Sequence, residues 1–244
     1  MAKSGQANKF GIVLIIAVAA IIGAGAFYIL SGEEEPAKSA GTDQPVNQVE
    51  QKAETPSVAK PETPVVTSNT VVEVHDTDMI LGAEDAPITI IEYASMTCPH
   101  CANFHQNTWP ELKKNWIETG KVRFIFREFP FDRPGLAAAM LARCGGEDRF
   151  FAFIDVLFAQ QARWSRSPDP MAELQKVALL GGVSPEEFEA CMTDPALEET
   201  VLNSRLEGNQ KYEVSATPTL IINGEKFEAN HDYETLNEHL EGLI

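Results

Sequence analysis

Two cysteines, Cys98 and Cys101, stand where a strand gives way to a helix, and this arrangement constrains the fold of the chain most. Residues 88–93 (ITIIEY) are typical of a buried strand, and residues 98–117 of a helix in which Pro110 would introduce a kink. The spacing puts Cys98 at the helix N-terminus and Cys101 one turn later, so the two sulfurs can close a small ring. The pattern therefore predicts an α/β protein with redox-active sulfur between a strand and a helix.

Cys98 is the expected nucleophile, because disulfide exchange requires a thiolate. A free cysteine has a pKa of about 8.5, and a helix dipole supplies only about 0.3–1 kcal/mol towards lowering it. Backbone N–H donors at the helix start and a positive His100 would add to this, while Pro99 suits the first helical turn. Stabilising the thiolate stabilises the reduced form, which makes the disulfide a strong oxidant. Cys101, deeper in the helix, would resolve the mixed disulfide.

Other interpretations of the CxxC motif remain open. Cys98 and Cys101 could form a structural disulfide, or with His105 supply three of the four ligands that a zinc site needs. An isomerase or a reductase could use the same residues, and a metal-binding module is a non-enzymatic alternative. We expect redox chemistry without a dissociable cofactor and without a metal.

The remainder of the chain reads as one sheet with helices around it. Further elements are expected as a strand at 122–129, a helical block at about 134–207, a strand at 219–222, a hairpin turn at Asn223-Gly224, a returning strand at 225–228 and a closing helix at 233–243. Residues 71–74 could be a short strand or the start of the domain.

The N-terminal residues indicate export. Residues 10–30 form an uncharged apolar run, long enough to cross a membrane as a helix, and Lys3 and Lys9 precede it. The positive-inside rule leaves residues 1–9 in the cytoplasm and the bulk of the chain outside. We favour an uncleaved anchor over a cleaved signal sequence, for which residues 24–26 (AGA) have the small-x-small form of a cleavage site.

A linker is expected between this segment and the domain. Residues 31–76 are rich in Glu, Pro, Thr, Ser, Lys and Gln and should be disordered, which leaves residues 77–244 as the folded domain. The chain of 244 residues carries a formal net charge of −17. Such an acidic balance argues against nucleic acid as a partner, because binding phosphates requires Lys and Arg.

The ten residues 92–101 (EYASMTCPHC) resemble the active-site region of DsbA-type oxidoreductases of the thioredoxin superfamily, with which the Cys-Pro-His-Cys tetrad is associated. The resemblance extends over about residues 76–244, and it is closest to membrane-anchored or exported DsbA-like proteins with an extra cysteine pair in the helical block. It implies a thioredoxin-like fold with an inserted helical block and an oxidising active-site disulfide.

Three site residues follow from the resemblance by position. It implies that Pro218 is cis and faces the disulfide, and that the backbone of Thr217 pairs with substrate; an ordinary strand-entry proline is the alternative. It also implies that Glu92 is a buried acid assisting proton transfer at the resolving thiol. Burial disfavours the charged form of a carboxyl group, which suits it to carry protons. A strand-edge Glu92 pointing to water is the alternative.

The second cysteine pair, Cys144 and Cys191, lies in the predicted helical block. We expect a structural disulfide between them, closing a loop of about 47 residues and stabilising the fold by roughly 4 kcal/mol in the chain-entropy model. Two buried free thiols are the alternative. The histidines at 75, 105, 231 and 239 are interpreted as surface or packing residues.

The predicted function is the donation of disulfides to exported proteins through the Cys98–Cys101 couple. The expected partners are exported cysteine-containing proteins and, by resemblance, a DsbB-like quinone-linked membrane oxidase that restores the disulfide. The expected location is the periplasmic or extracytoplasmic face of a bacterial inner membrane, either through a single-pass anchor or by secretion after cleavage.

Overall fold

The computed structural model describes residues 72–244. The apolar run at 10–30, the residues before it and the linker as far as residue 71 lie outside the described residues. Within residues 72–244, no helix combines the length and the apolarity that a membrane crossing requires.

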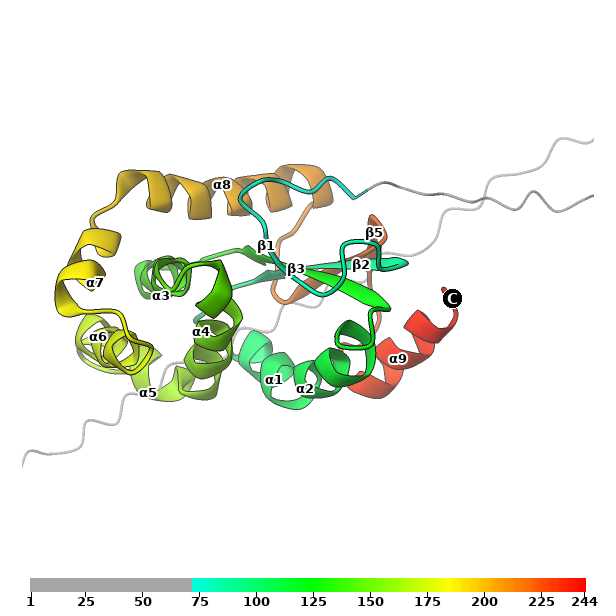
Figure 1. The fold of residues 1–244 in the computed structure, drawn as a ribbon, viewed down its shortest axis with the longest axis horizontal. Coiled ribbons are helices and arrows are strands. Elements are labelled where there is room, and N and C mark those ends of the chain that lie inside the picture. Colours follow the sequence, from blue (N-terminus) through cyan, green and yellow to red (C-terminus); the bar gives the residue numbers. More distant parts are fainter. Residues whose placement is uncertain (1–71) are drawn as a thin grey trace, which may run out of the picture. The chain divides into compact units, whose positions relative to one another are not determined.

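The centre of the molecule is a mixed five-stranded sheet with the strand order β1-β3-β2-β4-β5 (Figure 1). The strands are β1 (Met79–Leu81), β2 (Ile88–Ala94), β3 (Val122–Glu128), β4 (Thr219–Ile222) and β5 (Glu225–Phe227). β2 and β3 are parallel, and the other three pairings are antiparallel. The four strands that the sequence predicts are confirmed, and β1 is an addition at the edge.

β1 was not predicted, because a strand of three residues is too short to show an alternating pattern. It pairs with β3 from Met79 opposite Phe126 to Leu81 opposite Phe124. Residues 72–74 form no strand, although Val72 packs against the core, so these residues belong to the folded unit. The domain therefore includes residues that the sequence assigned to the linker.

Alternation along the central strands divides the core into two layers. Ile90 and Phe124 point to the larger cluster of buried side chains, and Ile91 and Ile125 to a smaller cluster on the opposite face. Both faces are covered, because β2 and β3 are buried on each side.

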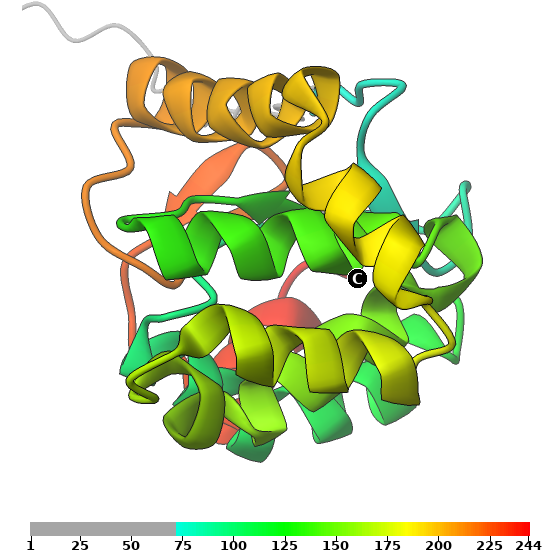
Figure 2. The same ribbon diagram turned by 90° about the vertical axis from the view of Figure 1, so that its left-hand side faces the viewer.

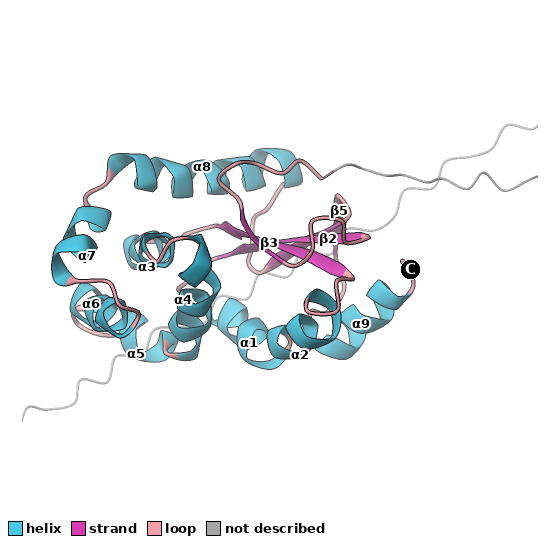
Figure 3. Cartoon of the chain, in the orientation of Figure 1, coloured by secondary structure: helices cyan, strands magenta, loops and turns pink. Residues whose placement is uncertain are grey.

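Helices cover both faces of the sheet (Figures 1 and 3). One face packs against α1 (Pro99–Asn107), α2 (Trp109–Leu112), a π-helical turn (Lys113–Ile117) and α9 (Tyr233–Glu241), whereas α8 (Pro195–Tyr212) crosses the other. α8 approaches β2 closely at its one internal glycine: a Cβ atom on Gly208 would lie 2.6 Å from the ring of Tyr93. A side chain at this position would push the helix off the sheet.

The predicted helix over residues 98–117 is interrupted earlier than expected. α1 ends at Asn107, and α2 begins at Trp109 with Pro110 in its first turn. Pro110 has no N–H to donate to a carbonyl of the preceding turn, so the break in the helical hydrogen bonds falls N-terminal to the proline.

The helical block inserted between β3 and β4 begins with α3 (Arg133–Cys144), α4 (Glu147–Ala159), α5 (Gln161–Ser165), α6 (Pro170–Leu180) and α7 (Pro185–Met192). Figure 2, which faces the block, shows α3 between α8 and α6. The block confirms the predicted insertion, although α8 extends beyond the expected end.

Sharp helix starts define the block. Four helices begin with a capping side chain that accepts a backbone N–H bond and is followed, directly or after one residue, by proline; the caps are Asp132, Asp169, Ser184 and Asp194. Both features satisfy or remove the donors that a helix N-terminus leaves without partners.

A disulfide joins the C-terminal ends of α3 and α7. It links Cys144 to Cys191, with the Cα atoms 6.2 Å apart. The bridge confirms the expected pairing and excludes the alternative of two free thiols. It fixes α7 against the centre of the block.

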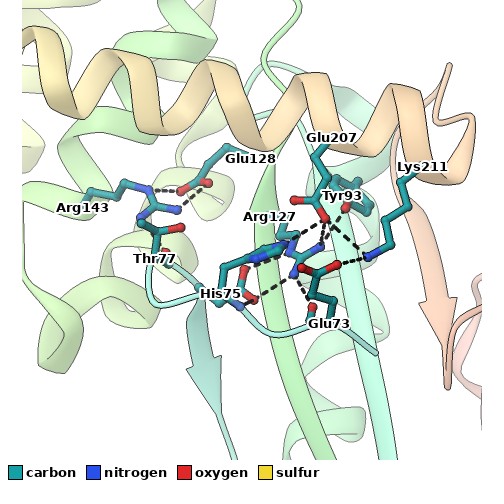
Figure 4. A network of polar contacts seen from close by, with 10 residues as sticks. Glu73, His75, Thr77, Tyr93, Arg127, Glu128, Arg143, Glu207 and Lys211 are labelled. Atoms are coloured by element: carbon teal, nitrogen blue, oxygen red, sulfur yellow. Dashed lines mark hydrogen bonds and ion pairs between the residues drawn. The ribbon is translucent and has the colours of Figure 1, made fainter. Parts of the chain in front are cut away.

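A buried guanidinium group holds the start of the domain against the α8 face (Figure 4). Arg127 uses all five of its N–H groups: two bind the carboxylate of Asp78, and the others bind Tyr93 Oη, Glu207 Oε1 and the Glu73 carbonyl, at 2.8–3.0 Å. The side chains of Arg127 and Asp78 are 2% and 4% exposed. Residues 73–78 are therefore an integral part of the domain.

Candidate active site

The site is built around the turn that connects β2 to α1. Cys98 is the N-cap residue of α1 with extended backbone angles, and Pro99 occupies the first helical position. The Gln161 side chain, from α5, donates to the carbonyl oxygens of Met96 and Cys98, both at 2.8 Å. These bonds fix the turn from the side of the helical block.

A second tie connects this turn to the start of α3. Thr97 Oγ1 donates to Asp132 Oδ2 at 2.9 Å, and Asp132 also caps α3. β2 and β3 are parallel, so the segments that follow them emerge at the same edge of the sheet. The active-site turn is thus held between two helix N-termini.

The two thiols have opposite environments. Cys98 is partly exposed, and its Sγ donates to the Thr217 carbonyl oxygen at 3.2 Å; Cys101 is fully buried. The pKa of Cys98 is lowered from 9.0 to about 5, above all by a hydrogen bond from the Cys101 thiol. Partial burial opposes this shift, and the Thr217 side chain and the backbone N–H groups of Cys101 and His100 reinforce it.

The hydroxyl of Thr217 is the group suited to stabilise the thiolate. The Thr217 carbonyl can only accept a bond, so it favours the protonated thiol of Cys98. Thr217 Oγ1 is buried and has no hydrogen-bond partner within residues 72–244, which leaves its proton available for a negative sulfur. Thr217 therefore offers one group for each protonation state of Cys98: its carbonyl oxygen binds the thiol, and its hydroxyl can bind the thiolate.

Cys101 resists ionisation. Burial raises its pKa well above 9.0, and the hydrogen bond to Cys98 and the negative charge of Glu92 act in the same direction. At neutral pH the reduced site thus holds one thiolate, at Cys98, and one thiol. This asymmetry makes the outer sulfur, that of Cys98, the one suited to nucleophilic attack.

Glu92 lies beneath Cys101 in the interior. It is fully buried on β2, and its Oε2 lies 2.8 Å from His105 Nε2. The alternative of a strand-edge glutamate pointing to water is therefore wrong. His105, interpreted from sequence as a surface or packing residue, is buried and paired with this carboxylate.

Neither His105, which was considered only as a zinc ligand or as a surface or packing residue, nor Gln161 was predicted as part of the redox site. His105 follows Cys101 by four residues, so the two share one face of α1, and the face that buries Cys101 also points at β2. That spacing could have identified it. Gln161 reaches the site only through the packing of α5, for which the sequence holds no local signal.

The proline loop closes the site opposite α1. The Thr217–Pro218 peptide bond is cis, the isomer that the resemblance implied, and both residues border a cavity of about 820 Å³. His100 is exposed at the start of α1 and lines the same cavity with His231. Its contribution to the low pKa of Cys98 runs through its backbone N–H.

The residues considered as zinc ligands do not converge. His105 faces Glu92, and within residues 72–244 no group of three or more His, Cys, Asp or Glu side chains is arranged to hold a metal ion.

Comparison with known proteins agrees with this geometry. The family model described as Thioredoxin matches residues 74–242. A Rickettsia bellii protein named as a protein-disulfide oxidoreductase is 35% identical over 76% of this chain and 71% of its own length. Disulfide bond formation protein D of Bacillus subtilis is 30% identical over 66% of this chain and 75% of its own length. The crystal structure of Wolbachia pipientis α-DsbA1 matches with a TM-score of 0.67 and 32% identity, over 72% of this chain and 96% of that one.

Proposed function

The chain belongs to the thioredoxin family, among the DsbA-type thiol–disulfide oxidoreductases, and we propose from this that it donates its Cys98–Cys101 disulfide to exported proteins. The observation that carries the proposal is the contrast between the two thiols. A Cys98 pKa of about 5 stabilises the reduced form near neutral pH, and stabilising the reduced form makes the disulfide oxidising.

The proposed cycle starts from the oxidised protein. A substrate thiolate attacks Cys98 Sγ, the Cys98–Cys101 bond breaks, and a mixed disulfide forms between Cys98 and the substrate. A second substrate thiolate then attacks the substrate sulfur of this bond, which releases the oxidised substrate and the Cys98 thiolate. Cys98 leaves readily because a thiol of low pKa is a good leaving group.

The substrate segment would lie along the proline loop. The backbone of Thr217 is the proposed pairing partner, with Pro218 beside it, and the adjoining cavity gives room for residues that flank the substrate cysteine. Asp232 and Glu234 make part of this cavity acidic. Substrate segments with basic residues are favoured there by charge complementarity.

The cellular setting belongs to the same proposal. An N-terminal anchor or signal at residues 10–30 and a linker to about residue 71 would present the domain on the extracytoplasmic face of the membrane. Reoxidation would require a DsbB-like, quinone-linked membrane oxidase. The support for this setting is the apolar run in the sequence and the relationship to DsbA-type proteins.

The redox equilibrium with glutathione tests the function. We expect an equilibrium constant in the oxidising range of DsbA rather than that of thioredoxin, and fast oxidation of a reduced, unfolded substrate protein. A thioredoxin-like constant would contradict disulfide donation and favour a reductase; activity only on scrambled disulfides would favour an isomerase.

Two cysteine variants separate the roles of the sulfurs. Cys98→Ser should abolish disulfide transfer. When the Cys98 thiolate of Cys101→Ser attacks the disulfide of an oxidised substrate peptide, a mixed disulfide forms and one substrate thiol is released. This adduct should accumulate on non-reducing gels, because no Cys101 thiol remains to displace the peptide from Cys98. The matched control is the double variant Cys144→Ala/Cys191→Ala, which removes the other pair and should retain transfer. Transfer by Cys98→Ser at the wild-type rate would refute the proposed nucleophile.

A further inference from the structure

The buried pair beneath the active site contains two polar atoms that the fold leaves without partners. Glu92 Oε2 and His105 Nε2 are bound to each other at 2.8 Å, whereas Glu92 Oε1 and His105 Nδ1 are buried with no hydrogen-bond partner within residues 72–244. The side chains are 0% and 1% exposed. Leaving buried polar atoms unpaired is destabilising, so the pair is a poor choice for packing alone.

The surroundings make Cys101 the natural partner of this pair. From its own helix His105 is near Cys101, whose thiol senses the charge of Glu92. From the segment before α9, His231 also senses that charge. On α4, Asp155 accepts a hydrogen bond from the indole of Trp109 instead.

Aromatic rings enclose the remaining sides of the imidazole. The ring of Phe158, from α4, stacks on His105 with centroids 4.2 Å apart, and Phe126 and Trp109 lie within 6.0 Å. The imidazole is thus held in one place, with Glu92 as its hydrogen-bond partner. Such a setting suits a group that acts through its neighbour.

We propose that His105 is a positioning residue that holds Glu92 by Oε2, so that the free Oε1 supplies and removes the proton of Cys101 during disulfide exchange. The proposal rests on the proposed function and deepens it. In this proposal the buried acid Glu92 acts together with His105. The imidazole offsets the negative charge that proton transfer leaves on the carboxylate.

Proton transfer accompanies the breaking of the Cys98–Cys101 bond. A substrate thiolate attacks Cys98 Sγ, the Cys98–Cys101 bond breaks, and the electron pair stays on Cys101 Sγ. The Glu92 carboxyl group gives its proton to that sulfur and becomes a carboxylate, which accepts the Nε2–H bond of His105. A proton from water then restores the pair. In the reverse direction Glu92 takes the proton of Cys101 as that thiol becomes a nucleophile.

A kinetic double-mutant cycle tests the coupling. The rate at which a cysteine peptide reduces the oxidised protein is measured from pH 5 to pH 8.5 for the wild type, His105→Gln, Glu92→Gln and the double variant. His105→Gln should slow the reaction about tenfold and flatten its pH profile, less than the ~10²–10⁴-fold that removal of a general acid costs. In the Glu92→Gln background, His105→Gln should have no further effect.

The matched control is His239→Gln, an exposed histidine on α9 away from the site. It should keep the wild-type rate and profile. A wild type without exchange activity would instead overturn the proposed function, which separates the two failures. Rates for His105→Gln that fall by the same factor at every pH, or that add to those of Glu92→Gln, would show that His105 only packs.

Imidazole ¹⁵N spectra of the wild-type protein provide a test that needs no variant. The His105 resonances, recorded over the same pH range, should change with reduction of the Cys98–Cys101 bond and follow the pH dependence of the rate. Resonances that are the same in both redox states at every pH would overturn the proposal.

Discussion

The two buried ionic clusters on opposite faces of the sheet differ in how completely their polar atoms are paired. On the α8 face, Arg127 uses every one of its N–H groups, and Asp78 receives two of them. On the α1 face, Glu92 and His105 share one hydrogen bond and leave one atom each without a partner within residues 72–244. The side chains of Arg127 and Asp78, like those of Glu92 and His105, are almost fully inaccessible to water.

This difference separates a structural role from a chemical one. A fully paired cluster gains nothing from moving a proton, and loss of a member leaves a buried charge uncompensated. A partly paired cluster destabilises the fold but keeps free atoms that can exchange protons with a neighbour. The Arg127 cluster should therefore govern stability, and the Glu92–His105 pair should govern the rate of exchange.

The largest effect is expected from Arg127→Met. It leaves Asp78 buried without its partner, so the free energy of unfolding should fall by about 3–5 kcal/mol. Urea denaturation of the oxidised protein measures this change. In the folded variant the rate of disulfide exchange should stay within about twofold of the wild type, because the cluster lies across the sheet from Cys98. A large loss of rate with little loss of stability would reverse the distinction.

Glu92→Gln should show the opposite behaviour. The amide keeps the size of the side chain and can still bind His105, so the free energy of unfolding should change by no more than about 1 kcal/mol. The rate of reduction by a cysteine peptide should fall by about 10²-fold, the low end of the range for general acid catalysis. Stopped-flow kinetics and urea denaturation of the same sample give both numbers. A Glu92→Gln variant with a much lower free energy of unfolding and a normal rate of reduction would contradict the proposed role of Glu92.

The pH dependence of stability isolates the active-site thiolate. The pKa of Cys98 is about 5 in the folded protein and 9.0 as the reference, so the folded reduced form binds fewer protons between these values. Stability therefore rises with pH across this window and is lost as the pH falls towards 5. Because Cys98 is half exposed, we expect only about 1–2 kcal/mol between pH 5 and pH 8.

Reduced wild type and reduced Cys98→Ser, compared by urea denaturation at pH 5 and pH 8, measure this contribution. The serine variant lacks the titrating group, so the difference in unfolding free energy between the two proteins should grow with pH. An equal difference at both pH values would mean that the thiolate is not stabilised by the fold.

The smallest effect is expected at the rim of the Arg127 cluster. His75 Nε2 lies 2.9 Å from Glu207 Oε1, and its side chain is 31% exposed. Partly exposed pairs contribute little, so His75→Gln should lower the free energy of unfolding by less than about 1 kcal/mol. A thermal melt at pH 6 and pH 8 suffices to measure it. A loss comparable to that of Arg127→Met would show that the rim, and not the guanidinium, holds the cluster together.

Local patterns in the sequence were sufficient for most of the architecture. The strand before Cys98, the helix after it and the Asn223-Gly224 turn each have a short-range signature, and each is present in the structure. Cys98 and Cys101 needed only their place between strand and helix. Pro218 and Glu92 needed the family resemblance as well, because neither a proline nor a single glutamate carries a local signal of its role.

Long-range contacts account for what could not be predicted. β1 exists because β3 offers it an edge, and Gln161 reaches the active-site turn because α5 packs beside it. The Arg127 cluster joins residues from β3, α8 and the segment before β1, which are far apart in sequence. His105 is intermediate, since its four-residue spacing from Cys101 was visible but its pairing with Glu92 depends on how α1 sits on β2.

The bridge between Cys144 and Cys191 has a further consequence for how the protein tolerates proteolysis. It makes a covalent ring that contains α4, α5 and α6. A protease that cuts the backbone once inside this ring leaves both fragments attached through sulfur, so they cannot diffuse apart. A single nick in the helical block can therefore remain harmless as long as the surroundings are oxidising enough to preserve the bond.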